Sequence, residues 1–110
     1  MTLRIIIADD HPVVRIGARS VIESSGAGEV VAEASSSQQL LAQLASHPCD
    51  VLVTDYSMPE STAPDGFAMI SMIRRHYPQL PILMLSVSSN LAILRMVRDA
   101  GVLGLVDKGS

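Results

Sequence analysis

The 110-residue sequence predicts one α/β domain in which helices cover both faces of a parallel β-sheet. Short apolar runs of strand length alternate along the chain with segments that repeat apolar residues at helical spacing. The strand-like runs are nearly continuous in apolar residues, as is typical of parallel strands buried on both faces. Apolar residues make up 48% of the chain and charged residues 17%, a composition that supports a packed core and argues against disorder.

The first strand and helix are clearly marked. Leu3–Ala8 is rich in β-branched residues and predicts a buried strand, which Asp9–Pro12 interrupts. A proline in this position is favourable in the first turn of a helix. We therefore expect a helix that ends near Ser25 and Gly26. The apolar residues expected to face the sheet are Val14, Ala18, Val21 and Ile22.

The same alternation continues along the chain. Ser35–Ser37 supplies hydroxyls that can cap a second helix, and Gly101 suits the C-terminal end of a fourth. The remaining strands are expected at residues 30–34, 51–54, 82–85 and 103–106. The apolar positions of the second, third and fourth helices are Leu40, Leu41, Leu44 and Ala45; Phe67, Ile70 and Ile73; and Leu91, Leu94 and Val97.

Four strand–helix units and a final strand predict a flavodoxin-like, doubly wound five-stranded parallel sheet with strand order 2-1-3-4-5. Such a sheet normally carries a fifth helix, and the chain ends at Ser110 before one can form. We expect this domain, residues 1–110, to be truncated before its last helix. The apolar surface left beside the first helix would favour self-association, or would be covered in a longer chain.

Charge and composition exclude several classes of protein. A net charge of −3 argues against direct binding of nucleic acid by this domain. No apolar run reaches the length of a membrane span, and the predicted first strand leaves no room for a signal peptide. The single cysteine, Cys49, cannot form an internal disulfide and fits a reducing compartment. We expect a cytoplasmic domain with no membrane partner.

Polar side chains follow four of the five predicted strands. Because the carboxyl ends of parallel strands meet at one edge of the sheet, we expect these side chains to gather there. They are Asp9 and Asp10 after the first strand, Asp55 after the third, Ser86 after the fourth, and Asp107 and Lys108 after the fifth.

Three carboxylates at one edge repel one another unless a cation lies between them, and Mg²⁺ suits such oxygen ligands. Mg²⁺ can also neutralise a phosphoryl oxygen, and Lys108, the only lysine, and Ser86 can contact the others. Asp55 would then be the nucleophile that forms an aspartyl phosphate. Taken singly, each residue has an ordinary alternative as a helix cap, a turn former or a solvated side chain. Their combination favours a phosphoryl site.

On these residues, together with Asp55–Pro59, the whole chain resembles a response-regulator receiver domain. The segment Asp9–Gly17 is similar to receivers of the NarL/LuxR type, which usually precede a helix-turn-helix DNA-binding domain. The resemblance implies that DNA is bound only through a C-terminal output domain that is not present in this chain. It also implies a signalling switch rather than a turnover enzyme.

The resemblance implies a role for each matching residue. Asp55 accepts the phosphoryl group from a histidine kinase or phosphotransfer protein. Asp10 binds Mg²⁺ directly, Asp9 binds it through water, and the backbone carbonyl of Ser57 completes the protein ligands. Ser86 and Lys108 contact the phosphoryl group. Ser57 and Ser88 offer no carboxylate or amide to orient water, so we expect slow loss of the phosphoryl group.

Two departures from the family keep a pseudo-receiver open as an alternative, acting by protein contacts without phosphorylation. Leu105 stands where many receivers carry an aromatic switch residue, and Val87 stands where a small residue is usual.

A dehalogenase-type phosphohydrolase is disfavoured because it needs D-x-D after the first strand, where this chain has Asp9, Asp10 and His11. A flavodoxin-like nucleotide binder is disfavoured because adjacent carboxylates would repel a phosphate. His11 itself is interpreted as a loop histidine that borders the acidic site.

Overall fold

The computed structural model describes residues 2–26, 28–55, 66–86 and 104–107. They form a five-stranded parallel sheet with the order β2-β1-β3-β4-β5, which confirms the predicted topology. The predicted fourth helix falls outside the described residues. The strands are β1 (Leu3–Ala8), β2 (Gly28–Ala34), β3 (Val51–Asp55), β4 (Ile82–Ser86) and β5 (Gly104–Asp107), and the helices are α1 (Pro12–Ser25), α2 (Ser37–Ser46) and α3 (Gly66–His76).

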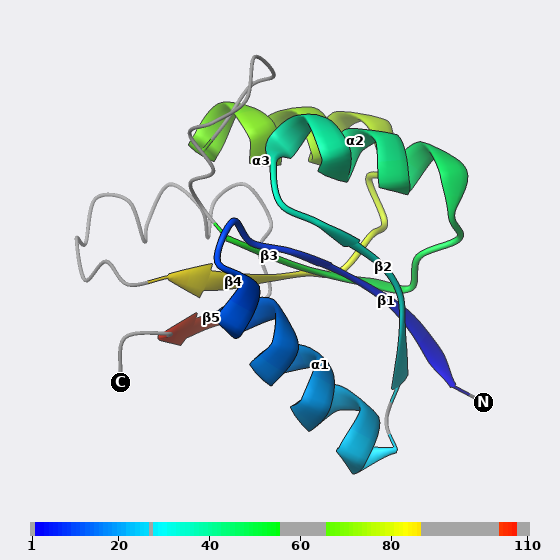
Figure 1. Ribbon diagram of the computed structural model, residues 1–110. Helices are drawn as coiled ribbons and strands as arrows, with labels where there is room; N and C mark the ends of the chain where they lie inside the picture. The colour runs from blue at the N-terminus through cyan, green and yellow to red at the C-terminus, as the bar shows by residue number, and fades with distance from the viewer. Residues whose placement is uncertain (1, 27, 56–65, 87–103, 108–110) are drawn as a thin grey trace.

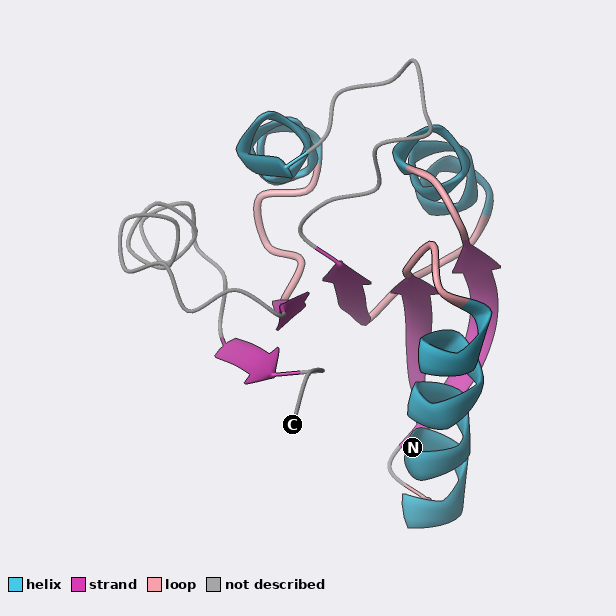
Figure 2. Cartoon of the chain, turned by 60° about the vertical axis from the view of Figure 1, so that its left-hand side comes forward, coloured by secondary structure: helices cyan, strands magenta, loops and turns pink. Residues whose placement is uncertain are grey.

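Helices cover both faces of the sheet. Figure 1 shows α2 and α3 together on one face and α1 on the other, and the rotated view in Figure 2 agrees. The larger apolar cluster lies under α2 and α3, and the smaller one lies under α1. Alternate residues of β1 point into the two clusters, with Ile6 in the larger and Ile5 and Ile7 in the smaller, as the two-residue repeat of a strand requires.

The helix ends follow the sequence closely. α2 begins after Ser36, whose hydroxyl accepts a hydrogen bond of 3.1 Å from the backbone N–H of Gln39. α1 ends at Gly26, which has a φ of 73°, the left-handed conformation that glycine adopts without strain. Strand β2 is two residues longer than predicted, because Gly28 and Glu29 pair with Leu3 and Arg4 of β1 despite their low strand propensity. No helix in the described part of the chain is long and apolar enough to cross a bilayer.

Helix α1 lies more shallowly on the sheet than the sequence predicts. Val14, Ala18 and Ile22 pack on the smaller cluster as expected, but none of the helix residues is fully buried. Val21, which we expected on the same face, is 71% exposed. Arg15 lies on the sheet side instead, with its Nε 3.3 Å from Glu33 of β2 and its side chain 20% exposed. The face of α1 that meets the sheet therefore includes Arg15 and leaves Val21 in solvent.

Two glycines provide a matched test of this packing. A Cβ at Gly28 would lie 2.6 Å from Ile5 Cδ1 and 3.0 Å from the backbone oxygen of Leu3, whereas one at Gly17 would meet no described atom within 4 Å. We expect Gly28→Ala to lower the free energy of unfolding by about 1–3 kcal/mol because β1 and β2 must move apart. Gly17→Ala should raise it by about 0.5–1 kcal/mol because alanine favours the helix. Urea unfolding measures both, and equal effects would contradict the described β1–β2 contact.

Candidate functional site

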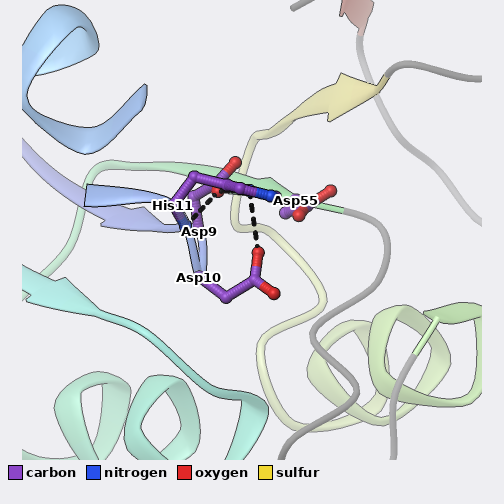
Figure 3. Close-up of side chains that lie close together, drawn as sticks. All are labelled: Asp9, Asp10, His11 and Asp55. Carbon is purple, nitrogen blue, oxygen red and sulfur yellow. Dashed lines mark hydrogen bonds and ion pairs between the residues drawn. The ribbon is translucent and has the colours of Figure 1, made fainter. Parts of the chain in front are cut away.

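An acidic cluster forms where β1 and β3 end. These strands are neighbours, and the pairing of Ala8 with Thr54 brings the following residues, Asp9 and Asp55, side by side. Both are buried, with exposed fractions of 0% and 6%. Each of Asp9, Asp10, His11 and Asp55 offers one ligand atom, and these atoms all lie within 4.8 Å of one another. Figure 3 shows the four side chains facing a common space. The predicted convergence of the three carboxylates is therefore present.

Asp9 is held firmly in this cluster. Its backbone N–H donates to the carbonyl of Ala34 in β2 at 3.0 Å, and its backbone carbonyl accepts from Arg15 Nη1 at 2.6 Å. Its carboxylate Oδ1 accepts from the backbone N–H of His11 at 2.8 Å, which fixes the turn into α1. The ordinary alternative considered for Asp9 was a cap of this helix, but the N-cap of α1 is His11. The hydrogen bond from His11 places Asp9 in the turn before the helix, with its carboxylate beside Asp55.

His11 links the two neighbouring carboxylates. Its Nδ1 lies 2.8 Å from Asp9 Oδ1 and 2.9 Å from Asp10 Oδ1 (Figure 3). The residue is the N-cap of α1, but its side chain makes no capping hydrogen bond. Although 60% of the side chain is exposed, the ring nitrogen faces the acidic cluster. From the sequence we interpreted His11 as a loop residue at the border of the site, whereas the structure places its ring nitrogen within the acidic cluster.

The donor set fits a hard divalent cation. Asp10 Oδ1 is buried and makes no hydrogen bond of acceptable geometry with any described residue, although His11 Nδ1 is 2.9 Å away. Because hydrogen bonds depend steeply on direction, this short distance alone does not satisfy the oxygen. A buried carboxylate oxygen without a good donor, beside two further carboxylates, suits a cation with oxygen ligands.

The remaining predicted site residues are described only in part. The backbone places Ser86 at the end of β4, one residue beyond Leu85, the partner of Asp55 across the β3–β4 pair. Ser86 itself pairs with Asp107, the last residue of β5. Their side chains are not described, and Ser57 and Lys108 lie outside the described residues. The strand ends therefore follow the predicted order, while these side-chain roles stay predictions.

Behind the acidic cluster lies a layer of ion pairs that the sequence analysis did not predict. Glu33 of β2 contacts Arg15 Nε at 3.3 Å and Arg19 Nη1 at 2.7 Å, and Arg19 also contacts Glu23 at 3.4 Å. The hydrogen bond to Glu33, followed by the charge of Glu23, raises the pKa of Arg19. The available sequence signal was the charged Glu33 near the end of a largely apolar strand, opposite two arginines one helical turn apart.

A separate hollow of about 650 Å³ lies at the opposite end of the sheet. Leu44, His47, Tyr77 and Pro81 are among the residues that line it. Asp50, the one carboxylate among the described residues that line it, is paired with Arg4 through contacts of 2.8–3.1 Å, and this pairing holds the pKa of Asp50 below its usual value. The hollow therefore lacks the convergent acidic groups of the cluster, and we assign the candidate site to the cluster.

Comparisons with known proteins show the family of this chain. The chain matches the response regulator receiver domain over residues 5–110. It is 42% identical over 106 residues to the transcriptional regulatory protein RcsB of Salmonella typhi and 41% identical to RcsB of Escherichia coli K12. Both alignments cover 96% of this chain and 49% of the relative, so the chain spans about half the length of the curated relatives it matches.

Solved structures give the same result. The isolated receiver (REC) domain of RcsB from Salmonella enterica serovar Typhimurium, in the presence of the phosphomimetic BeF₃⁻, superposes with a TM-score of 0.93 at 39% identity. That match covers all of this chain and 80% of the other. RcsB bound to the rprA promoter superposes with a TM-score of 0.91, covering 99% of this chain and 89% of that one. Segments such as Ser57–Pro59 and Asn90–Leu94 also resemble the Rcs capsule-synthesis regulator, in agreement with these matches. On the sequence match and the shared fold, the chain belongs to the response regulator receiver domain family.

Proposed function

We propose that this domain accepts a phosphoryl group on Asp55 from the phosphohistidine of a histidine kinase or phosphotransfer protein. The observation that carries the proposal is the buried convergence of Asp9, Asp10 and Asp55 from two neighbouring strands, within 4.8 Å. The reaction depends on Mg²⁺, which suits this oxygen-rich donor set. In the full-length protein the phosphorylated domain controls a DNA-binding output domain and thereby transcription.

The three carboxylates have different tasks. Asp9 is tied down through its backbone and through Oδ1, which suits a group that holds a cation rather than one that attacks. Asp10 is partly exposed and has a buried oxygen without a good hydrogen bond, which suits direct contact with Mg²⁺. Asp55 faces both from the end of β3 and is the nucleophile. Asp9 would contact Mg²⁺ through a water molecule, and the backbone carbonyl of Ser57 would complete the protein ligands of the ion.

The phosphoryl transfer is a displacement at phosphorus, in which one bond forms as another breaks. A carboxylate oxygen of Asp55 forms a bond to phosphorus as the P–N bond of the phosphohistidine breaks, and the leaving imidazole keeps the electron pair. The product is an acyl phosphate. Bound Mg²⁺ neutralises charge shared between the carboxylates and the phosphoryl oxygens. Lys108 and Ser86 contact the remaining oxygens, and the phosphoform decays slowly because Ser57 and Ser88 cannot orient water.

Phosphorylation changes the domain through the charge that it adds. An aspartyl phosphate brings up to two negative charges and three acceptor oxygens to the strand ends, enough to reposition Ser86 and the segment that follows it. One related structure is described as two RcsB dimers bound to two parallel DNAs, which supports a self-associating receiver linked to a DNA-binding domain. A pseudo-receiver role, considered because of Leu105 and Val87, predicts no dependence on phosphate.

Phosphorylation of the isolated chain tests the proposal. With acetyl phosphate and Mg²⁺ we expect intact mass spectrometry to show the addition of one phosphoryl group, because the pocket itself performs the transfer. Asp55→Asn or removal of Mg²⁺ by EDTA should abolish the adduct. Asp50→Asn is the matched control, because Asp50 pairs with Arg4 away from the cluster, and it should keep the adduct. Absence of an adduct, or its survival in Asp55→Asn, would favour the pseudo-receiver.

Arg15 is a positioning residue in this proposal, because it contacts the Asp9 carbonyl and not the reacting atoms. We expect Arg15→Ala to weaken Mg²⁺ binding about tenfold by loosening Asp9, as loss of groups that orient metal ligands commonly does. Arg19→Ala is the control, since Arg19 also pairs with Glu33 but makes no described contact with Asp9. Calorimetric titration with Mg²⁺ measures both variants. Equal weakening by the two substitutions would show that the effect arises from Glu33 and not from the Asp9 contact.

A further inference from the structure

We propose that His11 supplies a ring nitrogen to the cation pocket, so that this pocket binds first-row transition ions such as Mn²⁺ and Ni²⁺ more tightly than Mg²⁺. The inference rests on the proposed function only in placing a divalent cation among the carboxylates. It adds a ligand from this chain's own sequence to the three carboxylates already considered. The ligand class is a divalent ion that accepts nitrogen as well as oxygen donors.

The first line of evidence is the position of the His11 imidazole. His11 begins α1 at the surface, and 60% of its side chain is exposed. Its Nδ1 nevertheless lies close to two carboxylate oxygens, 2.8 Å from Asp9 Oδ1 and 2.9 Å from Asp10 Oδ1. The ring extends from the end of β1 toward Asp55 (Figure 3). The nitrogen therefore lies among the groups that would hold the cation.

The distances match those of a coordination shell. With metal–ligand bonds of about 2.1 Å, adjacent ligand atoms of an octahedron lie about 3.0 Å apart and opposite ones about 4.2 Å apart. The distance of 2.9 Å from His11 Nδ1 to Oδ1 of Asp10, the direct carboxylate ligand, is close to the adjacent spacing. All four ligand atoms fall within 4.8 Å of one another, so one cation can be shared by Asp10, Asp55 and His11 after small side-chain adjustments, with Asp9 reaching it through water.

The backbone holds the ring at this place. The N–H of His11 donates to Asp9 Oδ1 at 2.8 Å, and its carbonyl accepts from Val14 and Arg15 at 3.1 and 3.2 Å. Pro12 follows directly and restricts the chain further. Ligands carried on a fixed backbone lose little entropy when the ion binds, which strengthens the site.

The chemistry of the donor atoms determines which ions bind more tightly when an imidazole is added to the site. Mg²⁺ favours oxygen ligands and keeps its waters, so an imidazole adds little to its binding. Ions from Mn²⁺ to Ni²⁺ accept imidazole, and the affinity for a mixed nitrogen and oxygen site rises along that series. The tautomer with the proton on Nε2 presents the Nδ1 lone pair to the ion. His11 therefore shifts the preference of the pocket toward transition ions.

The other two histidines serve as internal controls. His47 Nδ1 lies 3.2 Å from the carbonyl of Gln43, and His76 Nδ1 lies 3.0 Å from that of Met72. These contacts belong to the C-terminal ends of α2 and α3, and both residues line the hollow at the opposite end of the sheet. Neither belongs to the acidic cluster. A double substitution of both should leave the pocket intact.

The test combines affinity with direct detection of the nitrogen. Calorimetric titrations with Mg²⁺ and with Ni²⁺ are made on the 110-residue chain, on His11→Ala, and on the double variant His47→Ala/His76→Ala. We expect His11→Ala to lower the Ni²⁺ affinity by about tenfold or more and to change the Mg²⁺ affinity by less than about threefold. With Mn²⁺ bound, pulsed electron paramagnetic resonance should show ¹⁴N modulation from a coordinated imidazole. The modulation should persist in the double variant and vanish in His11→Ala.

Two results would overturn the inference. One is the absence of ¹⁴N modulation from the unaltered chain with Mn²⁺. The other is an equal change in Mg²⁺ and Ni²⁺ affinity on His11→Ala, including a rise in both, which would make the imidazole a competitor of the ion. The experiments distinguish failure of this inference from failure of the proposed function. An Asp55 adduct without the nitrogen signal overturns only the role of His11, whereas the nitrogen signal without an adduct overturns only phosphoacceptance.

Discussion

The confinement of three carboxylates at the end of two neighbouring strands is the constraint on which the rest of this structure depends. Asp9 is fully buried and Asp55 nearly so, and their ligand atoms lie within 4.8 Å of each other and of Asp10. Burial of like charges so close together is costly unless positive charge compensates them. The fold must supply both the rigidity that holds the carboxylates together and the means of compensation.

The rigidity comes from the central position of β1 and β3. Both strands are paired on each side, and both are covered by helices, so the pairing of Ala8 with Thr54 is fixed by contacts throughout the sheet. A slip of one residue in either strand would turn the apolar side chains of that strand to the opposite face of the sheet, away from the cluster in which they now pack. It would also separate Asp9 from Asp55. The apolar core therefore determines the site geometry as directly as the polar contacts do.

The sequence predicted the sheet order and the convergence of Asp9, Asp10 and Asp55, because both depend only on which residues end successive parallel strands. It did not predict the inward orientation of His11, which depends on the turn in which the Asp9 carboxylate accepts from the backbone N–H of His11. The exposure of Val21 was also missed, because the face of α1 that meets the sheet includes Arg15, whose partner Glu33 lies 18 residues away in the chain. Such long-range ion pairs leave little trace in local periodicity. The roles of Ser57, Ser86 and Lys108 stay predictions, since their side chains are not among those described.

The contacts of the nearby nitrogen-bearing side chains explain why we propose His11, and not Arg15, as a ligand of a cation in this cluster. Arg15 reaches the carbonyl of Asp9 and not its carboxylate, and Glu33 compensates the charge of its guanidinium. Arg19 is compensated in the same way by Glu33 and Glu23. This outer layer therefore fixes the position of Asp9 while adding little net positive charge to the pocket. The carboxylates keep their attraction for a metal ion, and His11 is the one nitrogen-bearing side chain in the described cluster that contacts them directly.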